Sequence, residues 1–390
     1  MSLVIDIHAL QTIPPSLINR DDTGAPKTAV FGGVPRQRVS SQSWKRAIRR
    51  YFETQFDSEQ IGDRSKRLPE KIARRLKAEG LEQSDAIART EKLFKAAGIK
   101  TEVDKKPKKA DADTPEHNPY PRTTYLIFLS QQQIDRAVEE LLARGDEKLT
   151  KNEAKEILDT NHSVDMAMFG RMIADDAAFN VDAAVQVAHA IGIHNSTPDF
   201  DYFTAVDDLA EEGEETGAGM IGTVQMMSST LYRYATVNMK GLEDNLGSAE
   251  VARQAAQHFI EAFIASMPTG KINTFANQTL PELVYVTIRD TRPVSLVNAF
   301  ETPVLEEANS SYQFTSGSDA EPKHRRTVAA ERLAQEARDV EEVYGFTPRA
   351  AFVLGIGDLS APFEGIAEKT TLTGLTDRVA DELKTLAGES

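Results

Sequence analysis

Strand-like segments in this chain are separated by long helical or irregular stretches. Residues 3–10 alternate apolar and polar side chains, which is the period-two pattern of a β-strand. Similar segments recur at 183–191, 230–239, 283–288 and 350–356. The chain therefore predicts an α+β fold whose strands are separated by large insertions.

A helix is expected from Ser41, because an apolar stripe follows it at helical spacing. Ser40 or Ser41 is a suitable N-cap, since a serine hydroxyl can accept a hydrogen bond from a free N–H of the first turn. The stripe consists of Trp44, Ala47, Ile48, Tyr51 and Phe52.

The remaining segments divide by composition. Residues 57–165 read as a separate helical insertion that begins with a basic helix at 64–77, and further helices are expected at about 248–266 and 325–343. Residues 194–229 read as a loop, since they are rich in glycine and carry six acids between Asp207 and Glu215. The C-terminal end reads as a polar tail.

Residues 19–50 form a basic segment in an acidic protein. They carry eight bases and two acids, whereas the whole chain has a formal net charge of −15. Such a local charge indicates that one face meets a polyanion, while the acidic remainder opposes nonspecific binding to nucleic acid. The bases are Arg20, Lys27, Arg36, Arg38, Lys45, Arg46, Arg49 and Arg50.

The expected helix could hold phosphate groups on its polar side. Lys45 and Arg49 are four residues apart, so both head groups project from one face, with Gln42 and Arg46 beside them. The helix N-terminus adds free N–H groups and the positive end of the helix dipole. An ordinary solvated helix face is the alternative interpretation.

Several other chemistries are excluded or weakly supported. The chain has no cysteine, which rules out disulfides, thiolate metal sites and cysteine nucleophiles. Its histidines lack metal-site spacing, and no phosphate-binding or dinucleotide-binding glycine motif occurs, so no cofactor is expected. Neither a signal peptide nor a membrane-spanning run is evident, and the cytosol is the expected compartment.

Two acid pairs keep a metal-dependent nuclease open as an alternative. Asp21–Asp22 and Asp175–Asp176 could in principle hold Mg²⁺ for phosphodiester cleavage. Aspartates beside glycine and proline are, however, more often turn formers.

Long motifs resemble the backbone subunit of the type I-E CRISPR surveillance complex Cascade, the CasC family. The N-terminal matches are IDIHAL, PPSLINRDDTGAPKTAVFGG and RVSSQSWKRAIR. VDMAMFGRM, AVQVAHAI, DFDYFTAVDDL and SSTLYRYATVNM follow in the family's order, and TFA and PVSLVNAFE lie nearer the C-terminus. Trp44 stands where the family usually has Leu, and Tyr202–Phe203 stand where some relatives have Trp-Phe.

The resemblance implies a modified RNA-recognition-motif (ferredoxin-like) palm formed by residues 1–56, 165–193 and 230–390. It also implies a helical fingers insertion at 57–164 and a protruding thumb at 194–229. Several copies would stack as a helical filament along the CRISPR RNA, without catalysis, and present the guide for pairing with invading target DNA. Other expected partners are the large, small, tail and RNA-processing subunits of Cascade; no membrane is expected.

The resemblance also implies RNA-binding residues. Arg171 and Met172 would contact the RNA, with Met172 wedging against bases, and Thr204 and Ile221 would flank a nucleotide that the thumb displaces at regular intervals. No residue of the basic fingers helix is assigned; it could contact target DNA or a neighbouring subunit, or be solvated. Besides the ribonuclease, a general single-strand coating protein remains an alternative. The palm residues expected to hold RNA phosphates are Arg20, Lys27, Ser40, Gln42, Lys45, Arg46 and Arg49.

Overall fold

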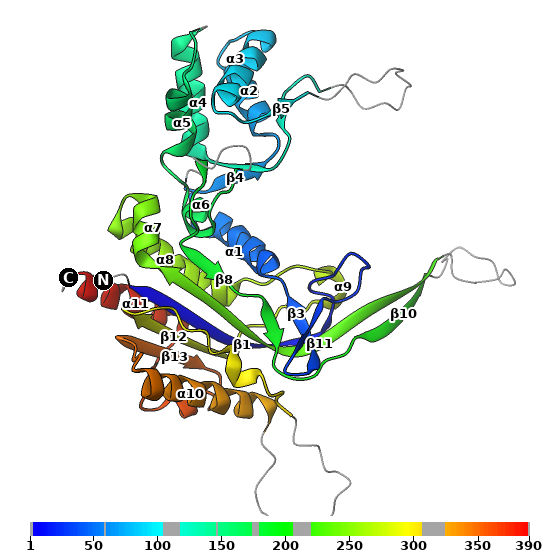
Figure 1. Ribbon diagram of the computed structural model, residues 1–390. Helices are drawn as coiled ribbons and strands as arrows, with labels where there is room; N and C mark the ends of the chain where they lie inside the picture. The colour runs from blue at the N-terminus through cyan, green and yellow to red at the C-terminus, as the bar shows by residue number, and fades with distance from the viewer. Residues whose placement is uncertain are drawn as a thin grey trace, which may run out of the picture. The chain divides into compact units, whose positions relative to one another are not determined.

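The computed structural model describes residues 3–57, 60–103, 118–145, 147–173, 179–205, 220–305 and 324–388. Its contacts group the chain into two compact units (Figure 1). The first unit comprises Met1–Tyr51, Gln186–Asn238 and Ala256–Ser390, and the second comprises Phe52–Val185 and Met239–Ala255. The expected α+β class is confirmed.

The first unit contains a mixed sheet with the strand order β14-β13-β12-β1-β11-β9-β3-β2. Its neighbours pair antiparallel except for β13 and β14, and β10 pairs with β11 beyond this path. The strands are β1 (Val4–Ser16), β2 (Thr28–Phe31), β3 (Val34–Val39), β8 (Val185–Val187), β9 (Ala190–Gly192), β10 (Asp199–Ala205), β11 (Met220–Asn238), β12 (Leu283–Arg289), β13 (Ala350–Gly355) and β14 (Glu368–Lys369).

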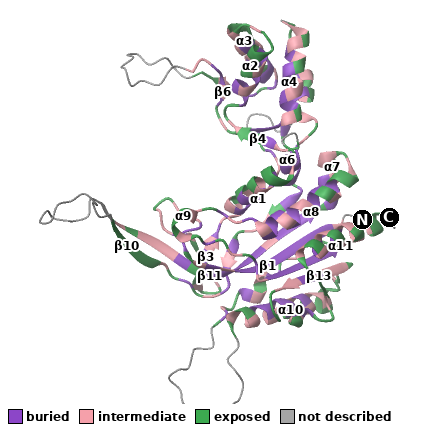
Figure 2. Cartoon of the chain, turned by 180° about the vertical axis from the view of Figure 1, so that it is seen from behind, coloured by how far each residue is buried: buried purple, intermediate pink, exposed green. Residues whose placement is uncertain are grey.

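Strand β1 is buried on both faces through most of its length, as Figure 2 shows. On one face, Leu10 belongs to a core cluster that includes Leu333 of α10 (Arg325–Tyr344). On the other, Ile13 belongs to a cluster with Trp44 of α1 (Ser41–Gln55). Helices on both faces explain why the expected strand at 3–10 has no solvent-facing side.

The first unit also contains shorter elements and a C-terminal helix. These are α9 (Ile272–Phe275), the 3₁₀ turns η2 (Val297–Phe300) and η3 (Ala361–Phe363), and α11 (Leu372–Gly388). Helices α1 and α8 (Ala249–Ala265) cross the boundary between the units.

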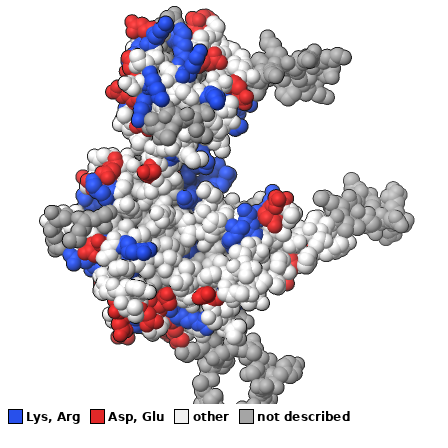
Figure 3. All heavy atoms as spheres, in the orientation of Figure 1, with Lys and Arg blue, Asp and Glu red and all other residues white. Residues whose placement is uncertain are grey.

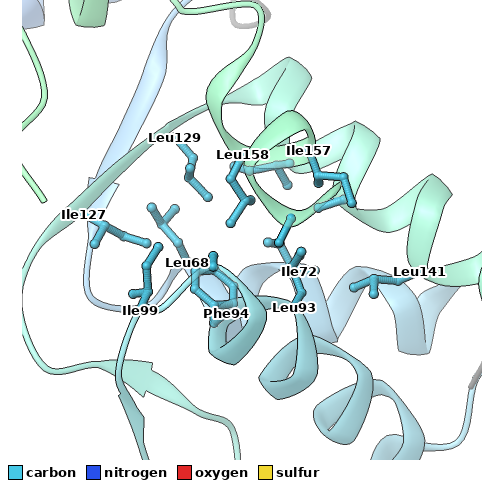
Figure 4. Packing of buried hydrophobic residues seen from close by; sticks show 14 of the residues in the cluster. Leu68, Ile72, Leu93, Phe94, Ile99, Ile127, Leu129, Leu141, Ile157 and Leu158 are labelled. Carbon is cyan, nitrogen blue, oxygen red and sulfur yellow. The ribbon is translucent and has the colours of Figure 1, made fainter. Parts of the chain in front are cut away.

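The second unit is mainly helical and has its own hydrophobic core (Figure 4). Ile72, Phe94 and Leu129 are among the side chains that meet there. Its elements are α2 (Leu68–Ala78), α3 (Gln83–Ala96), α4 (Gln131–Arg144), α5 (Lys151–Asp159), α6 (Val164–Phe169), α7 (Met239–Leu246), β4 (Gly62–Ser65), β5 (Thr101–Glu102), β6 (Arg122–Thr123) and β7 (Ile127–Ser130).

Three segments differ from the sequence-based expectations. Part of the expected irregular loop after the first strand is the β2–β3 hairpin, whose two-residue turn is Gly32–Gly33, with φ of 59° and 79°. Part of the expected loop at 194–229 is the β10–β11 hairpin. The expected polar tail contains α11, which buries Leu375, Val379 and Leu383 at helical spacing.

The grouping of residues also differs from the expected palm and fingers. Residues 165–185 group with the helical unit, whereas the resemblance implies palm for 165–193. Among the described residues, no helix has the length and apolar character that crossing a membrane requires.

Candidate nucleic-acid interface

The start of α1 is fixed by Ser40. Its Oγ accepts a hydrogen bond from the Ser43 backbone N–H at 3.3 Å, which is the N-cap contact expected from the sequence. Its own backbone N–H donates to Asn19 Oδ1 at 2.9 Å. The helix is therefore held at its N-terminus to the chain segment that carries Arg20.

The buried side of α1 fixes the direction of its basic side. Trp44 is only 1% exposed, and the Arg233 guanidinium lies over its indole ring. Arg233 also donates to Gln11 Oε1 at 2.6 Å and to the Phe263 carbonyl. Burial lowers the pKa of Arg233 to about 9. With Trp44 held inward, the basic side of α1 must face outward.

The expected phosphate-binding residues lie at or near the surface of the first unit. Gln42, Arg46 and Arg20 are exposed, whereas Lys45, Arg49, Lys27 and Ser40 are partly buried. Partial burial lowers the pKa of Lys45 from its ordinary value. Figure 3 shows lysines and arginines gathered over α1 and beside α9.

Arg36 is a structural residue of the basic segment. Its guanidinium is fully buried and donates to the backbone carbonyls of Gly192 (3.0 Å) and Glu301 (3.0 Å), and to that of Phe31 (3.1 Å). Not all eight bases of the segment therefore contribute to its outer charge.

The loop that carries Arg20 and Lys27 is closed by its own hydrogen bonds. The Lys27 backbone N–H donates to the Asn19 carbonyl at 3.0 Å, and Arg20 forms a β-bridge with Pro26. These hydrogen bonds place Arg20 and Lys27 where the two ends of the loop meet, close to the start of α1.

Asp21 forms the turn within this loop. Its Oδ1 accepts hydrogen bonds from the Thr23 hydroxyl (2.7 Å) and from the N–H groups of Thr23 (2.9 Å) and Ala25 (3.0 Å). The Thr23 hydroxyl contributes most to lowering the Asp21 pKa. Within the described ranges, no group of three or more His, Asp or Glu could hold a metal ion. Asp175–Asp176 lie outside those ranges.

Arg171 does not reach the surface, contrary to the expectation that it contacts RNA. Its Nε donates to the Phe179 carbonyl at 2.9 Å, its Nη1 to the Leu158 carbonyl at 3.0 Å, and its Nη2 pairs with Asp159. The neighbouring Met172 is 78% exposed. Arg171 thus anchors, inside the second unit, the backbone that presents Met172.

Thr204 and Ile221 are paired opposite each other in the β10–β11 hairpin. Figure 1 shows this hairpin extending from the rest of the sheet of its unit, so we call it the arm. The most exposed aromatic side chains of the arm are Phe200 (69%) and Tyr202 (62%). Gly222 gives room to Phe203, because a Cβ at position 222 would lie 2.4 Å from its ring. The acid run between Asp207 and Glu215 lies outside the described residues.

Four bases in and beside the basic helix of the second unit pair with acids. Arg67 and Arg74 of the α2 region both pair with Glu70 at 2.9 Å. Lys71 pairs with Asp63, and Arg75 pairs with Asp135. This pairing favours a solvated helix face over a nucleic-acid contact for α2.

Two buried arginines, one in each unit, carried no sequence signal. Arg233 is far along the chain from Trp44, and Arg171 is far from Phe128, whose carbonyl it binds. Nothing in the local sequence of either arginine marks a buried guanidinium. Only the fold brings them to their partners.

The chain matches known proteins over nearly its whole length. Residues 5–378 match the family described as CT1975-like protein. One solved chain, from a "CRISPR RNA-guided surveillance complex, pre-nicking", is 34% identical with a TM-score of 0.77; the alignment covers 97% of this chain and 100% of that chain. A second, from a "CRISPR RNA-guided surveillance complex", is 29% identical with a TM-score of 0.67 and coverages of 97% and 99%. No curated protein matches. The chain therefore belongs to the CT1975-like protein family.

Proposed function

We propose that this protein is a non-catalytic scaffold that binds CRISPR RNA in a type I-E surveillance complex. The observation that carries the proposal is the outward basic side of α1, in a chain that aligns over 97% of its length with subunits of RNA-guided surveillance complexes. Several copies bind side by side along the guide and present it for pairing with target DNA in antiviral defence.

The first unit acts as the palm, a modified RNA-recognition-motif fold, and holds the RNA by its phosphates. Lys45, Arg46 and Arg49 on α1, with Gln42 and Ser40 near its start, form one set of phosphate contacts, and Arg20 and Lys27 extend it. Phosphate contacts fix the position of an RNA strand without reading its sequence. This mode suits a scaffold that must accept any guide.

The arm acts as the thumb and works on the RNA of a neighbouring copy. Thr204 and Ile221, which are paired across the arm, flank a displaced nucleotide, and Met172 of the second unit contacts bases. Arg171 supports Met172 from the interior and makes no RNA contact of its own. The other Cascade subunits complete the particle in the cytoplasm.

Co-purification tests this function. The chain is expressed with its neighbouring genes and a CRISPR array, and the bound nucleic acid is run on a denaturing gel beside a native mass measurement. We expect one discrete RNA with several copies of the chain, and no shortening of that RNA when Mg²⁺ is added to the purified chain. Absence of RNA, or trimming by this chain, would contradict the proposal.

A further inference from the structure

A basic pocket lies beside α1 in the first unit. Its volume is about 420 Å³, and it is formed by residues 17–20, by one side of α1 and by residues 267–271. Four of its lining residues are cations, and none of the described residues that line it is Asp or Glu. The cations are Arg20, Arg46, Arg50 and Lys271.

Two neighbouring rows of polar side chains run along α1. Gln42, Lys45 and Arg49 form the first row, and all three belong to the proposed phosphate contacts. Ser43, Arg46 and Arg50 have the same spacing one residue later, so they form a second row about 100° further around the helix. The second row lines the pocket. The helix therefore carries cations toward two adjacent surfaces.

Lys271 reaches this pocket from a backbone conformation that side chains rarely adopt. Its φ and ψ are 47° and 32°, in the left-handed region, and α9 begins directly after it. Ala276, directly after α9, is also left-handed. Left-handed residues other than glycine cost energy and persist only where the surroundings hold them, often at functional sites.

The segment before Lys271 is held against Leu17 and Ile18, which also line the pocket. A Cβ on Gly270 would lie 2.3 Å from the Ile18 carbonyl oxygen and 2.7 Å from that of Leu17. Only glycine permits so close an approach of the two backbones. The pocket is thus a constrained feature, and Lys271 lines it together with Arg46 and Arg50.

We infer that this pocket binds a phosphate group of the RNA. It would be a second phosphate-binding site, beside the row formed by Lys45 and Arg49. Guanidinium groups bind phosphate through paired, charge-assisted hydrogen bonds, and an ammonium group adds a point charge. The inference rests on the proposed function and adds Arg50 and Lys271 to its RNA-binding residues. Together the two phosphate-binding sites would hold the RNA strand along both rows of α1.

Substitution of Lys271 separates binding from folding. Lys271→Gly removes the cation and suits the left-handed backbone, so we expect an unchanged or higher melting temperature together with weaker RNA binding. Lys271→Arg keeps the charge and should bind RNA like the unaltered chain. If Lys271→Gly binds as tightly as the unaltered chain, the inference is wrong.

Salt dependence measures how many phosphate groups the protein neutralises. The full chain with Arg50→Gln and Lys271→Gly is titrated with a fluorescent single-stranded RNA at several salt concentrations. The slope of log affinity against log salt should become shallower by about 0.7 for each phosphate group that the variant no longer neutralises. The matched control, Lys369→Gln with Arg378→Gln, removes the same charge near β14, at the far end of the strand order from β3.

The outcomes distinguish the two proposals. A shallower slope of log affinity against log salt in the pocket variant, but not in the control, supports phosphate binding in the pocket. Equal slopes in both variants overturn it while leaving RNA binding by the chain intact. Unchanged RNA binding with failure of copies to associate would show that the pocket instead takes carboxylates of a second copy. Absence of RNA binding by the unaltered chain would overturn the proposed function itself.

Discussion

The Cζ atom of Arg233 lies 3.7 Å from the centre of the Trp44 ring. This contact joins β11, near the middle of the sheet, to the buried side of α1. The same guanidinium lies 4.3 Å from the Phe263 ring centre, so it is enclosed by aromatic faces. A charge in the core of the first unit thereby sets the rotation of the helix whose opposite side is basic.

Trp44→Leu should destabilise the protein. The change opens a cavity and removes an aromatic partner from Arg233, so we expect a decrease in folding free energy of about 2–3 kcal/mol. Urea unfolding followed by circular dichroism measures it, with the exposed Val30→Ala as the control. An unchanged unfolding midpoint would show that Trp44 does not support the helix.

Lys45→Gln with Arg49→Gln should weaken RNA binding to the same extent for RNAs of any sequence. Two fewer neutralised phosphate groups should make the salt slope shallower by about 1.4. Fluorescence anisotropy with two RNAs of unrelated sequence checks this. A variant that discriminates between the two RNAs, or that retains the full slope, would refute the phosphate assignment of this row.

Arg171→Ala should lower the stability of the protein, whereas Met172→Ala should alter its RNA binding. Removing the Arg171 guanidinium takes from Asp159 its most buried partner, leaves several carbonyls without their donor, and should cost about 3–5 kcal/mol of folding free energy. Removing the exposed Met172 side chain should change stability by less than about 0.5 kcal/mol, while altering RNA binding. Thermal unfolding and RNA titration of both variants test the division of roles. Equal stability of the two would contradict it.

Replacing residues 200–225 with a two-glycine turn should leave a folded chain that does not assemble along RNA. The turn would join Asp199 to Met226, which are already paired. The longer deletion of 194–229 would also remove the fully buried Met227 and should unfold part of the core. Circular dichroism and native mass spectrometry with RNA distinguish folding from assembly. Normal filaments formed by the shorter deletion would refute the role of the arm.

Folding stability should fall between pH 7 and pH 5 because of His8. Burial, helped by the Arg289 charge, lowers the pKa of His8 to about 3, whereas an unfolded histidine titrates near 6.5. In this range the unfolded chain takes up a proton that the folded chain refuses, so stability decreases by about 2 kcal/mol as pH falls.

The comparison variant for this pH dependence is His8→Phe, which keeps the stacking on Tyr234 and Tyr285. Burial raises the pKa of Asp6. This shift makes folding stability rise as pH falls, opposite to the effect of His8, and it is present in both proteins. The difference between the two proteins therefore isolates His8. Parallel pH profiles of unfolding free energy would contradict the prediction.

The sequence predicted the elements whose periodicity is local. The stripe from Trp44 to Phe52 placed the start of α1 at Ser41, and the expected helix at 325–343 matches α10 within a residue. Both faces of these helices can be read from spacing alone. The β2–β3 hairpin was missed because its strands are short and its Gly32–Gly33 turn was read only as irregular loop.

Partners that are distant in the chain could not be predicted in this way. Arg36 and Arg171 look like surface cations in one dimension, yet carbonyls from remote segments enclose both. The charge of a segment therefore overstates its binding surface. Lys271 was missed for the same reason, since only folding brings it beside Arg46.

Strand β11 is continuous from the arm to the middle of the sheet. Residues Met220–Met226 pair with β10, and the residues that follow pair with β1, with a register shift between Ile13 and Ser16. Within this strand there is no flexible joint at which the arm could swing freely. A pulling force on its outer end would be transmitted along the backbone to the β1–β11 hydrogen bonds, so the whole ladder resists bending. The arm should accordingly bend little along its length, and it should bend most easily at the register shift.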